Sequence, residues 1–186
     1  MAQNEEEMPL VRIIVISVVV AAVLAGGWWL YKQSTYTKYF NASEGMQINY
    51  PKDWKMVQSP MPQAVVSFVS PKENALDTFQ ENVSITTTDL SSNPLSLEDY
   101  VLVTEDQMTG VFKDVKIDYS EPEVVGGKPG HKFVFSIVGE RPMKLVVYVF
   151  LEGTTAYNVT YMGMEDRFEK DSPIINDMMR SFKVFF

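Results

Sequence analysis

Several segments between residues 46 and 162 carry apolar side chains at alternate positions, which is typical of β-strands with one buried face. In segment 82–88, Val83, Ile85 and Thr87 fall on one face, while hydroxyl side chains fill the other. Segment 143–151 is apolar on both faces, so we expect a central strand there. The same reasoning predicts further strands over 46–50, 54–57, 64–69, 115–120, 132–138 and 154–162.

Two segments change from this alternation to the helical period. Ser96, with Asp99 three residues later, predicts a capped helix start, and the apolar stripe behind it consists of Leu97, Tyr100, Val101, Thr104 and Met108. Ser172 and Pro173 predict the cap and first residue of a second helix, whose inner face would hold Ile174, Met178 and Phe182. Strands with short connections and two such helices predict an α+β domain with a largely antiparallel sheet.

An uncharged run from Ile13 to Tyr31 precedes this domain. It has about the length of 20 residues that a helix needs to cross a bilayer. We therefore predict an N-terminal tail (1–9), a transmembrane helix (10–31), a juxtamembrane linker (32–45) and a domain (46–186). The side chains expected at the membrane interface are Arg12, Trp28, Trp29, Tyr31 and Lys32.

Two questions about this run stay open at the level of sequence. A cleaved signal peptide is the alternative to a retained anchor, because Val23-Leu24-Ala25 matches a small-residue cleavage site. The acidic leader and the length of the run favour retention. Arg12 stands on one side of the run and Lys32 and Lys38 on the other, so positive charge does not choose the orientation.

Composition excludes several classes of function. The 186 residues include 46% hydrophobic side chains, enough for a core, and carry a net charge of −8 with scattered lysines. A nucleic-acid-binding protein would show a basic stripe instead, so we expect no nucleic-acid partner. The chain has no cysteine, which excludes disulfides, thiolate nucleophiles, zinc–thiolate sites and iron–sulfur clusters.

The stretch before strand 82–88 holds the main candidates for chemistry. Asp77 and Glu81, with Asp89 as a further candidate, could supply oxygen ligands to a divalent cation, although the spacing lacks a calcium-loop signature. In the alternative, Asp77 and Asn82 accept hydrogen bonds from a turn and Phe79 plugs the core below it. We favour the structural interpretation, because turn chemistry of this kind is common, and we predict no cofactor.

Two other motifs are weaker still. His131 is the only histidine, and a lone imidazole without a thiolate or a second histidine makes a poor transition-metal site. Serine hydrolase chemistry would need a nucleophile motif such as G-x-S-x-G, which the chain lacks. The run 126–130, GGKPG, has proline after its lysine, so we predict a hairpin turn and no phosphate loop.

Several of these segments together resemble the PsbP-like family, which is named after an extrinsic protein of photosystem II. They read INYPKDW, FVSPKENALDTFQENVSITTTDL, SLEDYV and IINDMMRSFK, with the Asp-x-Phe-x-Glu-Asn-Val pattern the most specific. The resemblance covers nearly all of residues 40–186. It implies an α/β/α sandwich around a mostly antiparallel sheet, and a domain on the extracytoplasmic side of the membrane.

The resemblance also implies an accessory function. The expectation is a non-enzymatic, membrane-anchored subunit or assembly factor that docks on subunits of a larger integral membrane complex. The alternative is a tethered module that binds a small ligand or a divalent cation. A fold hosts many functions, so the family by itself does not choose between them.

Overall fold

The computed structural model describes residues 10–58, 64–112 and 114–185, apart from the side chains of 10–12, 29 and 32–34. The helices are α1 (Leu10–Thr35), α2 (Leu97–Val111) and α3 (Phe168–Ser181), with a short 3-10 turn, η1 (Glu165–Arg167). The strands are β1 (Tyr36–Asn41), β2 (Met46–Pro51), β3 (Lys55–Val57), β4 (Ala64–Val69), β5 (Asn82–Asp89), β6 (Val115–Val125), β7 (Lys128–Ile137), β8 (Met143–Glu152), β9 (Thr155–Met164) and β10 (Lys183–Val184).

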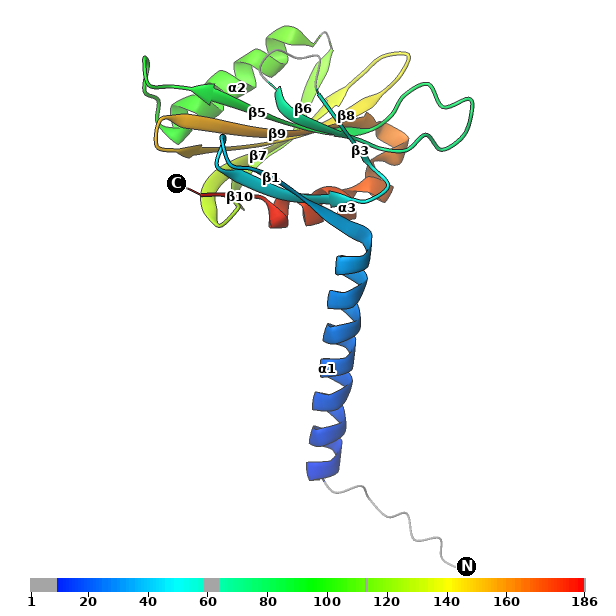
Figure 1. Cartoon of the computed structure of the whole chain (residues 1–186). Coiled ribbons are helices and arrows are strands. Elements are labelled where there is room, and N and C mark those ends of the chain that lie inside the picture. Colours follow the sequence, from blue (N-terminus) through cyan, green and yellow to red (C-terminus); the bar gives the residue numbers. More distant parts are fainter. Residues whose placement is uncertain (1–9, 59–63, 113, 186) are drawn as a thin grey trace, which may run out of the picture. The chain divides into compact units, whose positions relative to one another are not determined.

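The chain divides into two compact units, with the boundary between Thr37 and Lys38. The first unit holds α1, which continues to Thr35 (Figure 1). A membrane-spanning helix was expected over 10–31. Within the part of the chain that the structure describes, no helix is both long and apolar enough to cross a membrane. The predicted tail, 1–9, lies outside the described residues.

The second unit is built on a seven-stranded sheet in the order β3-β4-β5-β9-β8-β7-β6. Every neighbouring pair in it is antiparallel. A smaller three-stranded sheet has the order β1-β2-β10. The predicted α+β architecture with a mostly antiparallel sheet is therefore confirmed.

The two faces of the large sheet are covered by different helices (Figure 1). On one face, Tyr100 of α2 packs into a core with Phe133, Phe135, Leu145, Val147, Val149 and Ala156. On the other, Phe182 at the end of α3 lies against Phe150 of β8, with ring centroids 5.5 Å apart. Successive residues of β8 point to opposite faces of the sheet, and its central residues are buried on both faces. This explains why segment 143–151 is apolar throughout.

The capping prediction for α2 is confirmed, since the Ser96 side chain accepts a hydrogen bond from the backbone nitrogen of Asp99 at 3.0 Å. The predicted start of the last helix is wrong. α3 begins at Phe168, directly after η1, and Pro173 lies inside it. Pro173 has no N–H to donate to the Glu169 carbonyl, but it lies on the exposed side of α3. The helix remains continuous because the packing of its other side holds it in place.

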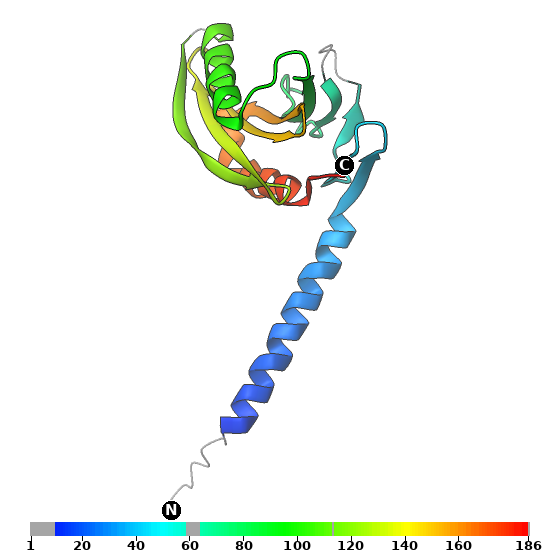
Figure 2. The same cartoon turned by 90° about the vertical axis from the view of Figure 1, so that its left-hand side faces the viewer.

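The turn between β6 and β7 is shorter than the sequence indicates. Gly126 and Gly127 alone form it, with φ of 60° and 84°, and Lys128-Pro129-Gly130 already belong to β7. Pro129 is tolerated there because β8 pairs with β7 only from Gly130 onward. The hairpin curves so that its turn reaches the end of α3 (Figure 2), where a Cβ on Gly126 would lie 2.8 Å from the Phe182 carbonyl oxygen.

Candidate functional site

A group of polar side chains, buried at its centre and exposed at its rim, joins the loop between β4 and β5 to the end of β9 and the start of α3. We call it the polar junction; it consists of Ser70, Glu73, Glu81, Tyr161, Arg167 and Asp171. Glu81 is 3% exposed, and its carboxylate accepts a hydrogen bond from the Ser70 hydroxyl at 2.9 Å. The Ser70 backbone nitrogen donates to the Glu81 carbonyl at 2.8 Å, so the two ends of the loop are held together.

The centre of the polar junction is a tyrosine–carboxylate pair. The Tyr161 hydroxyl donates to Asp171 at 3.0 Å, and both residues are almost fully buried. Burial raises the pKa of Tyr161, and the charges of Asp171 and Glu81 raise it further. The hydroxyl therefore stays protonated and serves as a donor. It does not serve as a base.

Gly163 has no side chain, and this gives the pair the room that it occupies. A Cβ at position 163 would lie 2.0 Å from the Tyr161 hydroxyl oxygen and 3.0 Å from Cγ of Glu81. The tyrosine side chain thus lies over Gly163 on its way to Asp171. No larger residue fits while Tyr161 keeps this position.

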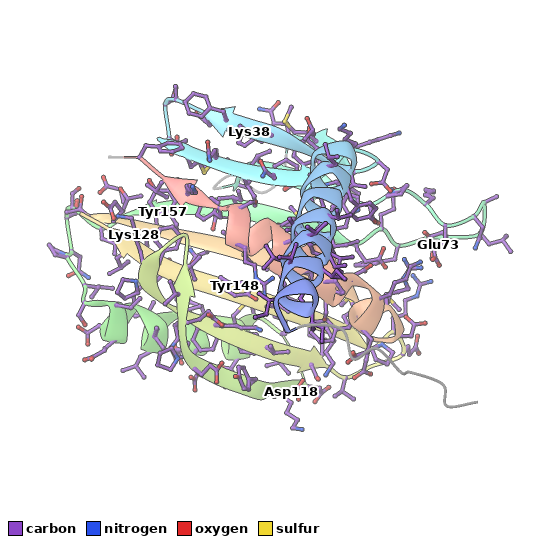
Figure 3. The ribbon with its side chains drawn as sticks, turned by 90° about the horizontal axis from the view of Figure 1, so that it is seen from below. Lys38, Glu73, Asp118, Lys128, Tyr148 and Tyr157 are labelled. Atoms are coloured by element: carbon purple, nitrogen blue, oxygen red, sulfur yellow. The ribbon has the colours of Figure 1, made fainter. Side chains whose placement is uncertain are left out.

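The exposed rim of the polar junction is charged. Arg167 pairs with Glu73, and Nζ of Lys170 lies 3.0 Å from the same carboxylate. Glu73, labelled in Figure 3, therefore ties the loop to α3. The buried Nε of Arg167 makes no hydrogen bond among the described residues.

The residues that were candidates for a cation site have different partners in the structure. Asp77 accepts hydrogen bonds from the backbone nitrogens of Glu73 and Phe79 at 3.0 and 3.1 Å, whereas Glu81 points to Ser70. Asp89 lies at the far end of β5, about 23 Å along the strand from its start, so it cannot share an ion with Glu81. Among the described residues, no three acidic or histidine side chains are grouped to hold a metal.

The structural role of the loop residues can be tested. Asp77→Ala removes two hydrogen bonds to backbone nitrogens, so we expect it to lower the free energy of unfolding by about 1 kcal/mol. We expect added calcium or manganese to leave the thermal midpoint of both proteins unchanged, because a ligand that binds only the folded state would raise it. Glu140→Ala, in another exposed loop, is the control. Loss of a calcium-dependent rise at unchanged stability would contradict this assignment.

Phe79 and Asn82, also predicted to be structural, lie at the end of the same loop. Phe79 is half-buried, and its backbone nitrogen is one of the two donors to Asp77. The Asn82 side chain accepts from the Ser84 hydroxyl at 3.5 Å, at the start of β5. The Phe79 contact holds the loop locally, whereas the Asn82 contact lies within β5.

A serine–histidine pair lies between β6 and β7, away from the polar junction. The hydroxyl of Ser120 is 2.8 Å from Nε2 of His131, and the imidazole packs on Phe133 with centroids 4.6 Å apart. Burial lowers the pKa of His131, although Glu105 and Glu121 oppose the shift, so the ring is neutral at pH 7. Sequence reasoning missed Ser120, because the two residues become neighbours only across the strand pair.

A second group that the sequence did not reveal surrounds Lys144 on β8. Its Nζ lies 2.7 Å from Asp118, 2.6 Å from Ser136 and 3.4 Å from Glu165. Burial alone would lower the pKa of Lys144, but the Asp118 and Glu165 carboxylates raise it overall. The ammonium stays charged and is not available as a base. Asp118 is labelled in Figure 3.

Of the five side chains expected at a membrane interface, two are described. Trp28 and Tyr31 are both 61% exposed on α1, with ring centroids 6.4 Å apart. The side chains of Arg12, Trp29 and Lys32 lie outside the described part of the structure.

Comparison with known proteins identifies one family. The PsbP family matches residues 34–184 of the chain. A search of curated proteins found no match.

Solved structures share the fold at low sequence identity. Cyanobacterial PsbP (CyanoP) from Synechocystis sp. PCC 6803 is 18% identical with a TM-score of 0.60, covering 81% of this chain and 93% of CyanoP. LpqN, involved in cell envelope biogenesis of Mycobacterium tuberculosis, is 8% identical with a TM-score of 0.61, covering 81% and 91%. The Ran-binding protein Mog1p from Saccharomyces cerevisiae is 9% identical with a TM-score of 0.57, covering 80% and 95%.

Proposed function

Because the chain belongs to the PsbP family, we propose that it is a non-enzymatic, membrane-anchored accessory or assembly factor. Its folded domain docks on subunits of a larger integral membrane complex. The observation that carries this proposal is the family match over residues 34–184, which includes the whole of the large sheet and the helices on both of its faces.

The use that the domain makes of its polar groups supports a non-enzymatic role. Glu81 and Asp171 are buried and accept hydrogen bonds from Ser70 and Tyr161. Lys144 is held as a cation by its carboxylate neighbours. An enzyme needs an acid, base or nucleophile that is free to meet a substrate, whereas these groups are engaged in holding the fold.

What supports the anchor is the sequence of the first unit, since no helix among the described residues is both long and apolar enough to cross a membrane. No charged residue occurs from Ile13 to Tyr31, and α1 is one continuous helix of 26 residues through this run. Its apolar side chains are exposed to an extent that water disfavours; examples are Val18 at 63%, Val23 at 67% and Leu24 at 67%. A bilayer would cover them, and membership of the PsbP family favours an extracytoplasmic domain beyond it.

Similar structures support binding as the activity. CyanoP is named as a cyanobacterial PsbP, and Mog1p is described as Ran-binding. Their identities to this chain, 18% and 9%, carry the fold and leave the partner open. The proposal therefore extends to a membrane complex and not to a particular one.

The proposal is tested by extracting tagged full-length protein with a mild detergent, followed by size fractionation and mass spectrometry of what travels with it. We expect stoichiometric co-migration with integral membrane subunits, and loss of that association on deletion of residues 1–33 or on disruption of the domain. Migration as a free protein of 21.1 kDa in its detergent micelle would contradict the proposal.

A further inference from the structure

The small sheet presents two faces of different chemistry. Its inner face turns Met46 and Ile48 of β2 into the core, both fully buried, and Tyr39 packs on Phe68 with centroids 5.7 Å apart. Side chains alternate along each strand, so the neighbouring residues lie on the opposite side. We call this the outer face; it consists of Lys38, Phe40, Gln47, Asn49, Lys183 and Phe185.

Two aromatic rings stand next to each other on the outer face. Phe40 is 58% exposed and Phe185 is 43% exposed, and their centroids are 5.8 Å apart. The Phe185 backbone nitrogen donates to the Gly45 carbonyl at 2.7 Å, so the C-terminal segment is held in place beside β2. The rings form a fixed apolar contact area that the rest of the domain does not cover.

The charge of the outer face is opposite to that of the protein. Its charged residues are Lys38 and Lys183, both exposed, in a chain that has 24 acidic and 16 basic residues. Neither lysine forms an ion pair with the described residues of the domain. The acid nearest to Lys38 along the chain, Glu44, has its carboxylate 3.5 Å from Thr87 on the large sheet.

The connection to α1 limits where this face can go. α1 ends at Thr35 and β1 begins at Tyr36, with no residue between them. The five residue-to-residue steps from Thr35 to Phe40 can span at most about 18 Å. If α1 is the membrane anchor, as the proposed function states, β1 must remain close to the lipid headgroups.

We propose that the outer face lies on the membrane surface and binds anionic lipid headgroups, with Phe40 and Phe185 reaching the boundary of the acyl chains. Aromatic rings suit this zone because it is apolar on one side and wet on the other. Lysines near an anionic leaflet are attracted to it by an amount equivalent to about fivefold in binding for each charge. Lys38 is labelled on β1 in Figure 3.

The test uses the full-length protein in vesicles, and the absence of cysteine makes it direct. Gln47→Cys places a single environment-sensitive fluorophore on the outer face, and Leu76→Cys places the same label in the β4–β5 loop, where the side chain is 88% exposed. In vesicles of phosphatidylcholine with phosphatidylglycerol, we expect nitroxide-bearing lipids to quench the label at position 47. The label at position 76 should stay in water.

Charge variants test the chemistry of the contact. K38Q combined with K183Q should lower the equilibrium constant for contact between the outer face and the lipid by about 30-fold. Vesicles of phosphatidylcholine alone should have a similar effect. K55Q combined with K72Q removes the same charge from exposed positions elsewhere and should change nothing. F40S combined with F185S should also release the label at position 47 to water.

The outcomes separate this inference from the anchor on which it rests. If the protein floats with vesicles after an alkaline wash but the label at position 47 remains in water, the anchor stands and the lipid contact is wrong. If the protein is released by the wash or by high salt, yet the label is quenched before release, the contact stands and the anchor is wrong. Failure to float at all overturns both. Quenching that stays unchanged in both the K38Q/K183Q and the F40S/F185S variants, or a label protected only by a co-purified protein, overturns the lipid contact.

Discussion

Phe182→Ala is expected to lower the free energy of unfolding by about 4 kcal/mol, because it empties a fully enclosed site in a packed core. Phe182 is 0% exposed, and its ring meets Phe150 edge-on at 5.5 Å and lies 6.4 Å from Tyr157. It follows the last residue of α3 and precedes β10, so its ring attaches both to the large sheet. Removing it leaves a cavity and weakens the closure of the small sheet.

The measurement is equilibrium unfolding in denaturant at fixed detergent concentration. The matched control is Phe185→Ala, three residues further along, whose ring is 43% exposed and should cost less than about 1 kcal/mol. Hydrogen exchange should show β2 and β10 losing protection in the Phe182 variant before β8 and β9 do. Equal losses in the two variants would show that Phe182 is not the attachment point inferred from its packing.

Gly163→Ala is expected to cost about 3 kcal/mol, although alanine usually suits a strand better than glycine. The added Cβ would lie 2.0 Å from the Tyr161 hydroxyl oxygen and 2.5 Å from Cζ, so the ring must move. Moving it breaks the hydrogen bond to Asp171 and leaves a buried carboxylate without that donor. The change is therefore larger than the volume of one methyl group suggests.

Gly139→Ala is the control, because a Cβ there meets nothing within 4 Å. Its unfolding free energy should stay within about 0.5 kcal/mol of the parent. Combining Gly163→Ala with Tyr161→Phe should cost at least about 1 kcal/mol less than the sum of the single changes, because both disrupt the same pair. Strict additivity would show that Tyr161 is not the group that position 163 accommodates.

Local pattern was enough to predict most of the strands and the start of α2. Alternation in segment 82–88 and the apolar run 143–151 correspond to β5 and β8, because side-chain direction along a strand depends only on neighbouring residues. The Ser96 cap is equally local, since its partner is Asp99. The start of α3 was missed because η1 and tertiary packing extend that helix past Pro173 toward its N-terminus.

The candidate site shows where local pattern stops. Asp77 and Glu81 stand out in the sequence as carboxylates near a strand. In the structure, Asp77 accepts hydrogen bonds within a turn, whereas Glu81 belongs to the buried part of the polar junction. Tyr161 and Asp171, the centre of that junction, carry no sequence signal, because a tyrosine in a strand and an aspartate in a helix are ordinary. What distinguishes them is a contact that forms only when β9 and α3 meet.

From the residues alone follow the family, the antiparallel α+β fold, the uncharged run before it, and the absence of any cysteine chemistry. The family follows from segments that resemble it, whereas the fold class, the uncharged run and the absence of cysteine chemistry depend on composition and on periods of two to four residues. The outer face and the polar junction depend on long-range pairing. β10 pairs with β2 from the other end of the domain, placing Lys183 beside Gln47, and no local pattern encodes which distant strand will be the neighbour.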